Sequence, residues 1–172
     1  MLIEVKKCDI SKSTSDALIY STNEDMMLTG GVGKKLLEVY GYELQSLIHS
    51  QLKKLGKSKA EVGTVIDCKT KEMPWKRVFH TVAVDREYET SEGTIFSILK
   101  TVFEECEMDF GIKHLSMSAL GCGYGSLTHT RFTEILLNVA EEYNNTDINR
   151  VTIFCNADNE YVDIQRTLGN VH

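Results

Sequence analysis

The stretch that decides the fold is D-A-L-I-Y-S-T-N at residues 16–23, followed by L-T-G-G-V-G at residues 28–33. A short apolar run of strand type, residues 17–20, ends at the polar Asn23. Glycines then let the backbone approach a ligand closely and adopt positive φ, and helical spacing begins at Val32. A strand, a glycine loop and a helix N-terminus in this order present unpaired N–H groups to an anion.

A second glycine loop, S-A-L-G-C-G-Y-G-S at residues 118–126, has the same setting. The strand before it ends near Met117, and the helix after it begins near Thr128. Neither loop matches the dinucleotide fingerprint or the P-loop. Because both loops follow a strand and precede a helix, we expect them to form an anion site together. At Gly123 a side chain would obstruct the anion and forbid positive φ.

Outside these loops, strand-like and helical patterns alternate along the chain. Short runs rich in β-branched and aromatic residues predict strands at 2–5, 17–20, 65–68, 78–84, 114–117 and 151–155. Helical periodicity predicts helices at 32–40, 43–52, 95–106, 132–143 and 159–168, with an interruption at Gly41. The order predicts an α/β protein, a three-layer α/β/α sandwich with a mixed, largely parallel sheet. Ligands bind at the carboxyl ends of such strands.

The bulk properties indicate a single domain, residues 1–172. A net charge of −6 argues against bulk nucleic-acid binding, which needs a basic face. No apolar run approaches the roughly 20 residues of a membrane helix, and residues 1–10 lack a signal-peptide pattern. We therefore expect a cytoplasmic protein with no membrane partner. The five scattered cysteines predict neither disulfides nor a metal site.

In order and spacing, these segments resemble the macrodomain family. C-D-I at residues 8–10 is similar to the early G-D-I segment of that family, and residues 16–23 are similar to its D-A-I-V-N-A-A-N strand. R-V-F-H-T-V at 77–82 resembles its V-I-H-x-V strand, and residues 116–125 resemble its F-P-A-I-x-T-G loop. The resemblance covers nearly the whole chain. It implies a macrodomain fold, ADP-ribose or ADP-ribosylated protein as the ligand, and no cofactor.

The resemblance also implies individual roles. Asp9, with Ile10 beside it, would accept a hydrogen bond from the adenine amino group, although Asp also suits a solvated turn. Asn23 would bind the distal ribose, although Asn also caps turns. The Tyr124 ring would lie over the distal ribose. Main-chain N–H groups would hold the diphosphate; they are those of Gly30, Gly31, Val32 and Gly33 in the first loop, and of Gly121, Cys122, Gly123, Tyr124 and Gly125 in the second.

The acid–base groups of two hydrolytic macrodomain branches do not match this chain. One branch uses the first Asn of N-A-A-N and an Asp after the glycine run, and here these positions hold Tyr20 and Gly33. The other is the terminal ADP-ribose protein glycohydrolase branch, which has a G-C-G-x-D loop. The segment G-C-G-Y-G at residues 121–125 resembles that loop closely. Its Asp is Gly125 here, and its Lys falls on Val84 or Ala83.

Three functions stay open on this sequence. The leading interpretation is a non-catalytic reader of ADP-ribose or of mono-ADP-ribosylated protein. A divergent ADP-ribosyl hydrolase would need another base, for which Glu24, Asp25 and Asp85 are the candidates. An interaction module that has lost its ligand is disfavoured by the intact glycine loops. We expect His80 to be a hydrogen-bonded core residue, and Cys122 to offer its backbone rather than act as a nucleophile.

Overall fold

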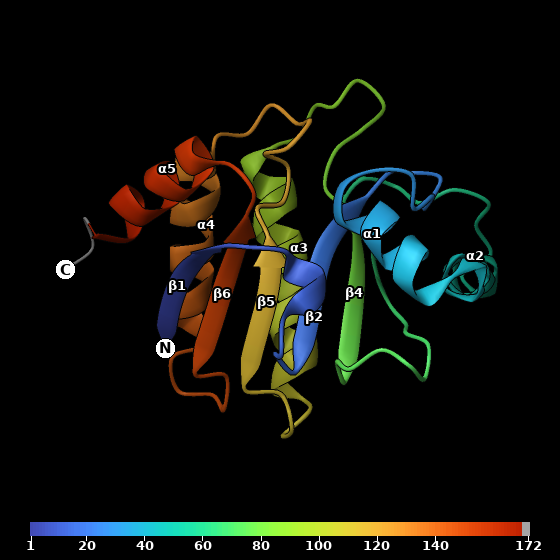
Figure 1. The fold of residues 1–172 in the computed structure, drawn as a ribbon, viewed down its shortest axis with the longest axis horizontal. Helices are drawn as coiled ribbons and strands as arrows, with labels where there is room; N and C mark the ends of the chain where they lie inside the picture. The colour runs from blue at the N-terminus through green and yellow to red at the C-terminus, as the bar shows by residue number, and fades with distance from the viewer. Residues whose placement is uncertain (170–172) are drawn as a thin grey trace.

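The structure is a computed structural model that describes residues 1–169, so residues 170–172 of the expected single domain lie outside the described residues. One six-stranded sheet has the order β1-β6-β5-β2-β4-β3, and all neighbouring strands are parallel except β3 and β4 (Figure 1). The strands are β1 (Leu2–Lys7), β2 (Ala17–Thr22), β3 (Val65–Asp67), β4 (Arg77–Val82), β5 (His114–Ser118) and β6 (Arg150–Cys155).

The helices alternate with the strands as the sequence predicts. Gly41, at φ +74°, separates the first two α-helices, and this left-handed backbone favours glycine. The side chains of Ser91 and Thr128 cap the N-termini of two others. The helices are η1 (Ile10–Lys12), α1 (Gly31–Tyr40), α2 (Tyr42–Lys54), α3 (Glu92–Glu107), α4 (His129–Glu142) and α5 (Asp158–Gly169). None of the helices within residues 1–169 is long and apolar enough to cross a membrane.

The sheet separates two apolar cores, which confirms the expected three layers. On one face, alternate residues such as Ile19, Met117 and Ile153 pack against α3, α4 and α5. On the other face, Leu18 and Val78 pack against α1 and α2. Figure 1 shows the pair α1 and α2 beside β2 and β4, at the opposite end of the sheet from β1.

The rest of that second face we call the open sheet face. It is the part formed by β1, β6 and β5, and in the described chain no α-helix covers it. Apart from Leu2, its residues are polar or aromatic, and they stand in register across the three strands. They include Glu4, Lys6, His114, Ser116, Arg150, Thr152 and Phe154.

His80 lies in the core of β4 and has both ring nitrogens satisfied. The Tyr20 hydroxyl lies 2.5 Å from Nδ1, and Nε2 lies 2.8 Å from the carbonyl oxygen of Cys68. Because a carbonyl only accepts, Nε2 carries the proton and Tyr20 donates to Nδ1. Tyr20 and His80 are both fully buried, which confirms the core role predicted for His80.

This network makes the stability of the protein depend on pH. Burial lowers the pKa of His80 from 6.5 to about 4, so at intermediate pH the unfolded chain binds a proton that the native state does not. The contribution of His80 to the free energy of unfolding is complete above pH 6.5 and is lost as the pH falls toward 4. At 1.36 kcal/mol per pKa unit, this loss is about 3 kcal/mol.

Urea unfolding across this pH range, on the wild type and on His80→Gln, measures the effect. The variant loses some stability throughout, because glutamine does not reproduce both ring contacts. Its free energy of unfolding should nevertheless fall less steeply with acidification. Equal slopes for the two proteins would show that His80 is protonated in the native state as readily as in the unfolded chain.

Candidate functional site

The loops singled out in the sequence leave the sheet at one edge. β1, β2, β5 and β6 are parallel neighbours, so their carboxyl ends meet there (Figure 1). The segments that follow them are Cys8–Lys12, Asn23–Gly30, Ala119–Thr128 and Asn156–Ala157. Both glycine loops therefore lie at the edge where parallel sheets bind ligands.

The first glycine loop leads directly into α1. Gly30 is its N-cap, and the first intrahelical hydrogen bond runs from the Lys34 N–H to the Gly30 carbonyl oxygen at 3.2 Å. The N–H groups of Gly31, Val32 and Gly33 therefore have no acceptor within the helix. Gly31 has φ +53° and is exposed. This arrangement suits an anion, because the N–H groups and the helix dipole both favour negative charge.

Gly33 has a second role that the sequence did not reveal. It is buried, and a Cβ there would lie 3.1 Å from Leu28 Cδ2 and 3.4 Å from Tyr20 Cε2. Its lack of a side chain lets α1 pack closely on β2. An aspartate at this position would have to displace those neighbours.

Asp9 both caps η1 and faces an ammonium group. Its Oδ1 accepts hydrogen bonds from the Ser11 N–H at 3.0 Å and from the Ser11 hydroxyl at 2.8 Å, and its Oδ2 lies 3.2 Å from Lys35 Nζ. Partial burial would raise the pKa of Asp9, but the hydrogen bonds from Ser11 and the charge of Lys35 lower it on balance. Asp9 is thus an ionised carboxylate that also caps η1.

A small cleft of about 90 Å³ joins the first loop to the end of β1. Three of the residues predicted from the sequence line it: Ile10, Gly31 and Val32. Lys35, Ser118, Phe154 and Asn156 contribute further walls, as does Cys8. Of the second glycine loop only its first residue, Ser118, lines this cleft, and Asn23 does not line it, although both loops lie at the same sheet edge.

The second glycine loop is shaped by two of its glycines. Gly121 has φ +76°, and its carbonyl oxygen accepts from the Leu127 N–H at 3.2 Å. A Cβ on Gly125 would lie only 2.1 Å from that same oxygen and 2.8 Å from Val84 Cγ1. The loop conformation therefore excludes any side chain at position 125, an aspartate included.

Gly123 differs from both of these glycines, and one expectation about it is wrong. Its φ is not in the positive region, which Gly121 occupies instead. It is exposed, and a Cβ would meet no heavy atom within 4 Å. The fold itself would accept a side chain here, so packing within the described chain does not require glycine at this position.

Cys122 and Tyr124, the two non-glycine residues predicted to bind the ligand in this loop, differ in burial. Cys122 is 8% exposed, and burial, with a smaller effect of Glu160, raises the pKa of its thiol to about 12. It is therefore a neutral thiol rather than a nucleophile. Tyr124 is 78% exposed, and its ring centroid lies 5.8 Å from that of Tyr88, which has φ +63°.

The candidate carboxylates are all engaged in loop contacts. Glu24 accepts from Arg86 Nε at 2.8 Å, and Asp25 lies 3.3 Å from Lys59 Nζ. Asp85 Oδ1 accepts from the N–H groups at 87 and 89, at 3.0 and 2.8 Å, and so holds the turn that carries Tyr88. None of the three carboxylates is buried.

Asn23 also has a structural contact. Its Oδ1 accepts from the Met27 N–H at 3.0 Å, and its carbonyl oxygen accepts from the N–H of Met26, which has φ +54°. The side chain is exposed at the end of β2. The side-chain oxygen of Asn23 therefore caps a turn, as the structural alternative for this residue expects. Its amide nitrogen donates no hydrogen bond to another group within residues 1–169.

Two charged side chains near the site were missed in the sequence. Lys35 stands four residues after Gly31 in α1, and this helical spacing could have placed it on the same face. Glu160 accepts from the N–H groups of Asn156 and Ala157 at 2.9 and 3.1 Å. An acidic residue in the first turn of a predicted helix is the signal for such a cap.

Comparison with known proteins agrees with this geometry. The family model described as Macro domain matches residues 19–136, which is more than half of the chain. The chain belongs to the Macro domain family. No curated protein matches it.

Solved macrodomains have the same fold. A glycine-to-valine mutant of the Oceanobacillus iheyensis macrodomain with ADPR has a TM-score of 0.84 at 18% identity, covering 98% of this chain and 91% of that one. The same organism's macrodomain with ADP has a TM-score of 0.84 at 17% identity, covering 97% and 90%. The Trypanosoma brucei macrodomain in complex with ADP-ribose has a TM-score of 0.79 at 16% identity, covering 97% and 69%.

Proposed function

We propose that this macrodomain is a non-catalytic reader that binds ADP-ribose, free or attached to a protein. The observation that carries the proposal is the meeting of two glycine loops and the α1 N-terminus at one sheet edge. The diphosphate would lie between these loops, held by main-chain N–H groups. Adenine would lie toward Asp9 and the distal ribose toward Tyr124.

The surroundings of the small cleft support this orientation. Asp9 is ionised, and a carboxylate accepts a hydrogen bond from an amino group. Asn156, after the last strand, lines the cleft but has no aromatic ring to stack on adenine. Lys35 adds positive charge between Asp9 and the N-terminus of α1.

We propose a reader without hydrolytic activity because of how the relevant residues are packed and bonded. Of the positions where hydrolytic branches would place their groups, Tyr20 is fully buried and bonded to His80. Gly33 and Gly125 are closely packed against neighbouring atoms. Glu24, Asp25 and Asp85 are engaged in loop contacts. No acid–base pair therefore stands ready beside the second loop.

We expect ADP-ribose to bind with a micromolar Kd and AMP to bind at least about tenfold more weakly, a difference of about 1.4 kcal/mol. AMP lacks the second phosphate and the distal ribose, so it loses the contacts to the second loop. Isothermal titration calorimetry with both ligands measures the difference. Equal affinities would show that only the adenosine half is recognised, and no binding of either would contradict the proposal.

Asp9→Asn is expected to weaken ADP-ribose binding by about 1–3 kcal/mol, the scale of a hydrogen bond to a charged group. Asparagine keeps an oxygen for capping η1, because Asn and Asp are similar N-caps. Its amide NH2, however, repels the adenine amino group. Calorimetry gives the affinity, and a thermal melt checks that the fold is kept.

The matched control is Asp109→Asn. Asp109 also accepts a local backbone hydrogen bond, from the Gly111 N–H at 3.1 Å, but it lies before β5 at the other edge of the sheet. This variant should bind ADP-ribose as the wild type does. An Asp9→Asn variant with wild-type affinity would leave Asp9 as a turn residue only.

A further inference from the structure

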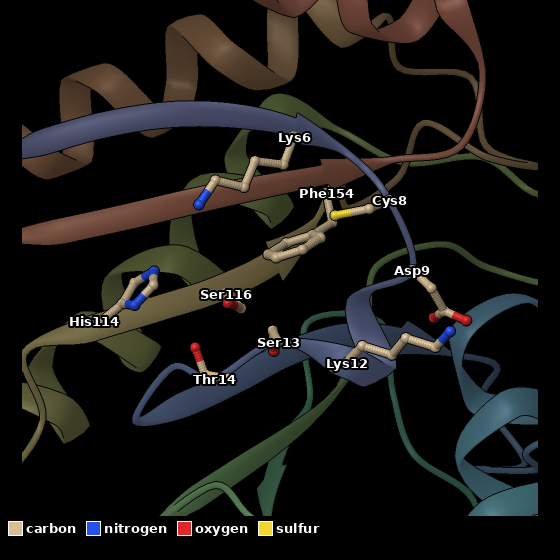
Figure 2. A pocket seen from close by; sticks show the side chains of 9 residues that line it. All are labelled: Lys6, Cys8, Asp9, Lys12, Ser13, Thr14, His114, Ser116 and Phe154. Atoms are coloured by element: carbon tan, nitrogen blue, oxygen red, sulfur yellow. The ribbon is translucent and has the colours of Figure 1, made fainter.

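The open sheet face carries a groove of about 310 Å³ that the two glycine loops do not line. Figure 2 shows Ser116 of β5 and Phe154 of β6 on the sheet, with Lys6 of β1 on one side. Lys12 and the chain after η1 form the other side. The volume lies at the lower end of the range for small-molecule sites, about 300–1,000 Å³, which suits a ligand with a single ring.

Ser116 gives the groove an unpartnered polar atom. The residue is fully buried, and within residues 1–169 its Oγ has no hydrogen-bond partner. Its neighbours across the sheet are Thr152 and Leu18. Leu18 offers no polar side-chain atom, and the Thr152 hydroxyl already donates to Glu4 at 2.9 Å. Because buried hydroxyls are nearly always paired in folded proteins, Ser116 points to a group that enters the groove.

His114 extends the polar lining. Its Nε2 lies 2.8 Å from the Thr152 hydroxyl oxygen, whose own proton goes to Glu4, so Nε2 is the donor. The neutral ring then has Nδ1 as an acceptor. The groove thus offers a hydroxyl at Ser116, with the ring of Phe154 on one side and an acceptor nitrogen at His114 on the other (Figure 2).

The charge at the rim favours an anion. Lys12 has no ion-pair partner among the described residues, and Lys6 shares one contact, 3.1 Å to Glu4. Asp9 is the one acidic residue that lines the groove, and Lys35 and Ser11 already engage it. The groove lining thus holds two lysines and one aspartate, although the protein as a whole has a net charge of −6.

We propose that this groove is a second binding site, for a small organic anion with a planar body. Its phosphate or carboxylate would pair with the lysines at the rim, its ring would pack on Phe154, and a polar atom would reach Ser116. Cys8 and Phe154 line both this groove and the small cleft, so the two sites are neighbours. The proposal does not depend on ADP-ribose binding.

The test uses phenyl phosphate as the probe on isotopically labelled protein, with and without saturating ADP-ribose. Chemical shifts of the His114 ring and of the Ser116 and Phe154 amides should move saturably in both conditions. Benzoate should bind as well, because it has the same ring and charge type. Benzyl alcohol, with the ring but no charge, should bind at least about tenfold more weakly.

Variants locate the binding. Lys12→Gln and Ser116→Ala should each weaken phenyl phosphate binding several-fold, while their melts stay cooperative. Lys7→Gln is the matched control, since it makes the same charge change beside Lys6 but the Lys7 side chain pairs with Asp158. Shifts that do not saturate, equal binding of benzyl alcohol, or displacement of the probe by ADP-ribose would each overturn the second site.

Discussion

Gly123→Val should abolish ADP-ribose binding, with a loss of at least about 100-fold, while the protein melts as the wild type does. The valine side chain would stand where the diphosphate meets the second loop. Two hydrogen bonds to a charged group, at about 1.5–3 kcal/mol each, account for such a loss. The melt should be unchanged because position 123 is exposed, has no positive φ and has no heavy atom near the added Cβ.

Two other glycine variants make this result specific. Gly169→Val places the same side chain at another open position, at the end of α5, and should leave both binding and melting unchanged. Gly125→Ala should lower the melting temperature, because its Cβ would lie 2.1 Å from the Gly121 carbonyl oxygen. Calorimetry and thermal melts of all three variants separate the effects. A Gly123→Val protein that melts normally and still binds would move the ligand away from this loop.

The sequence predicted the layers and the edge of the sheet that holds the site, because both depend on local patterns. The run Val151–Cys155 predicts a strand, and β6 does lie inside the sheet, although no α-helix covers its face with Thr152 and Phe154. Strand, glycine loop and helix N-terminus are adjacent along the chain. Parallel topology then brings Gly31 of one loop and Gly121 of the other to the same edge, without any knowledge of side-chain packing.

What the sequence could not predict depends on contacts between distant segments. Gly33 and Gly125 were assigned to ligand binding alone, yet each also fits against residues that only the fold brings close, such as Tyr20 and Val84. A glycine needed for packing and one needed for ligand access look the same in a sequence. The pairing of Tyr88 with Tyr124, 36 residues later, likewise follows from the turn held by Asp85.

The second prediction with a large effect concerns chemistry: release of ADP-ribose from modified proteins should be slow or absent. General acid–base groups each contribute about 10²–10⁴-fold in rate. The positions that would hold them carry Tyr20, Gly33, Gly125 and Val84 instead. The test is incubation with proteins mono-ADP-ribosylated on glutamate, on serine and on arginine, followed by measurement of released ADP-ribose. Rapid, stoichiometric release from any of them would contradict the reader assignment.

Variants of the three candidate carboxylates would then identify the base. Asp85→Asn is the sharpest, because asparagine keeps an oxygen for the N–H groups at 87 and 89 and removes only the charge. Glu24→Gln likewise keeps an acceptor for Arg86, and Asp25→Asn removes a surface ion pair of small energetic value. A variant that has lost a catalytic carboxylate would no longer release ADP-ribose from modified protein but would keep its affinity for ADP-ribose. If all three variants bind and none alters a residual rate, that rate comes from backbone electrostatics and positioning alone.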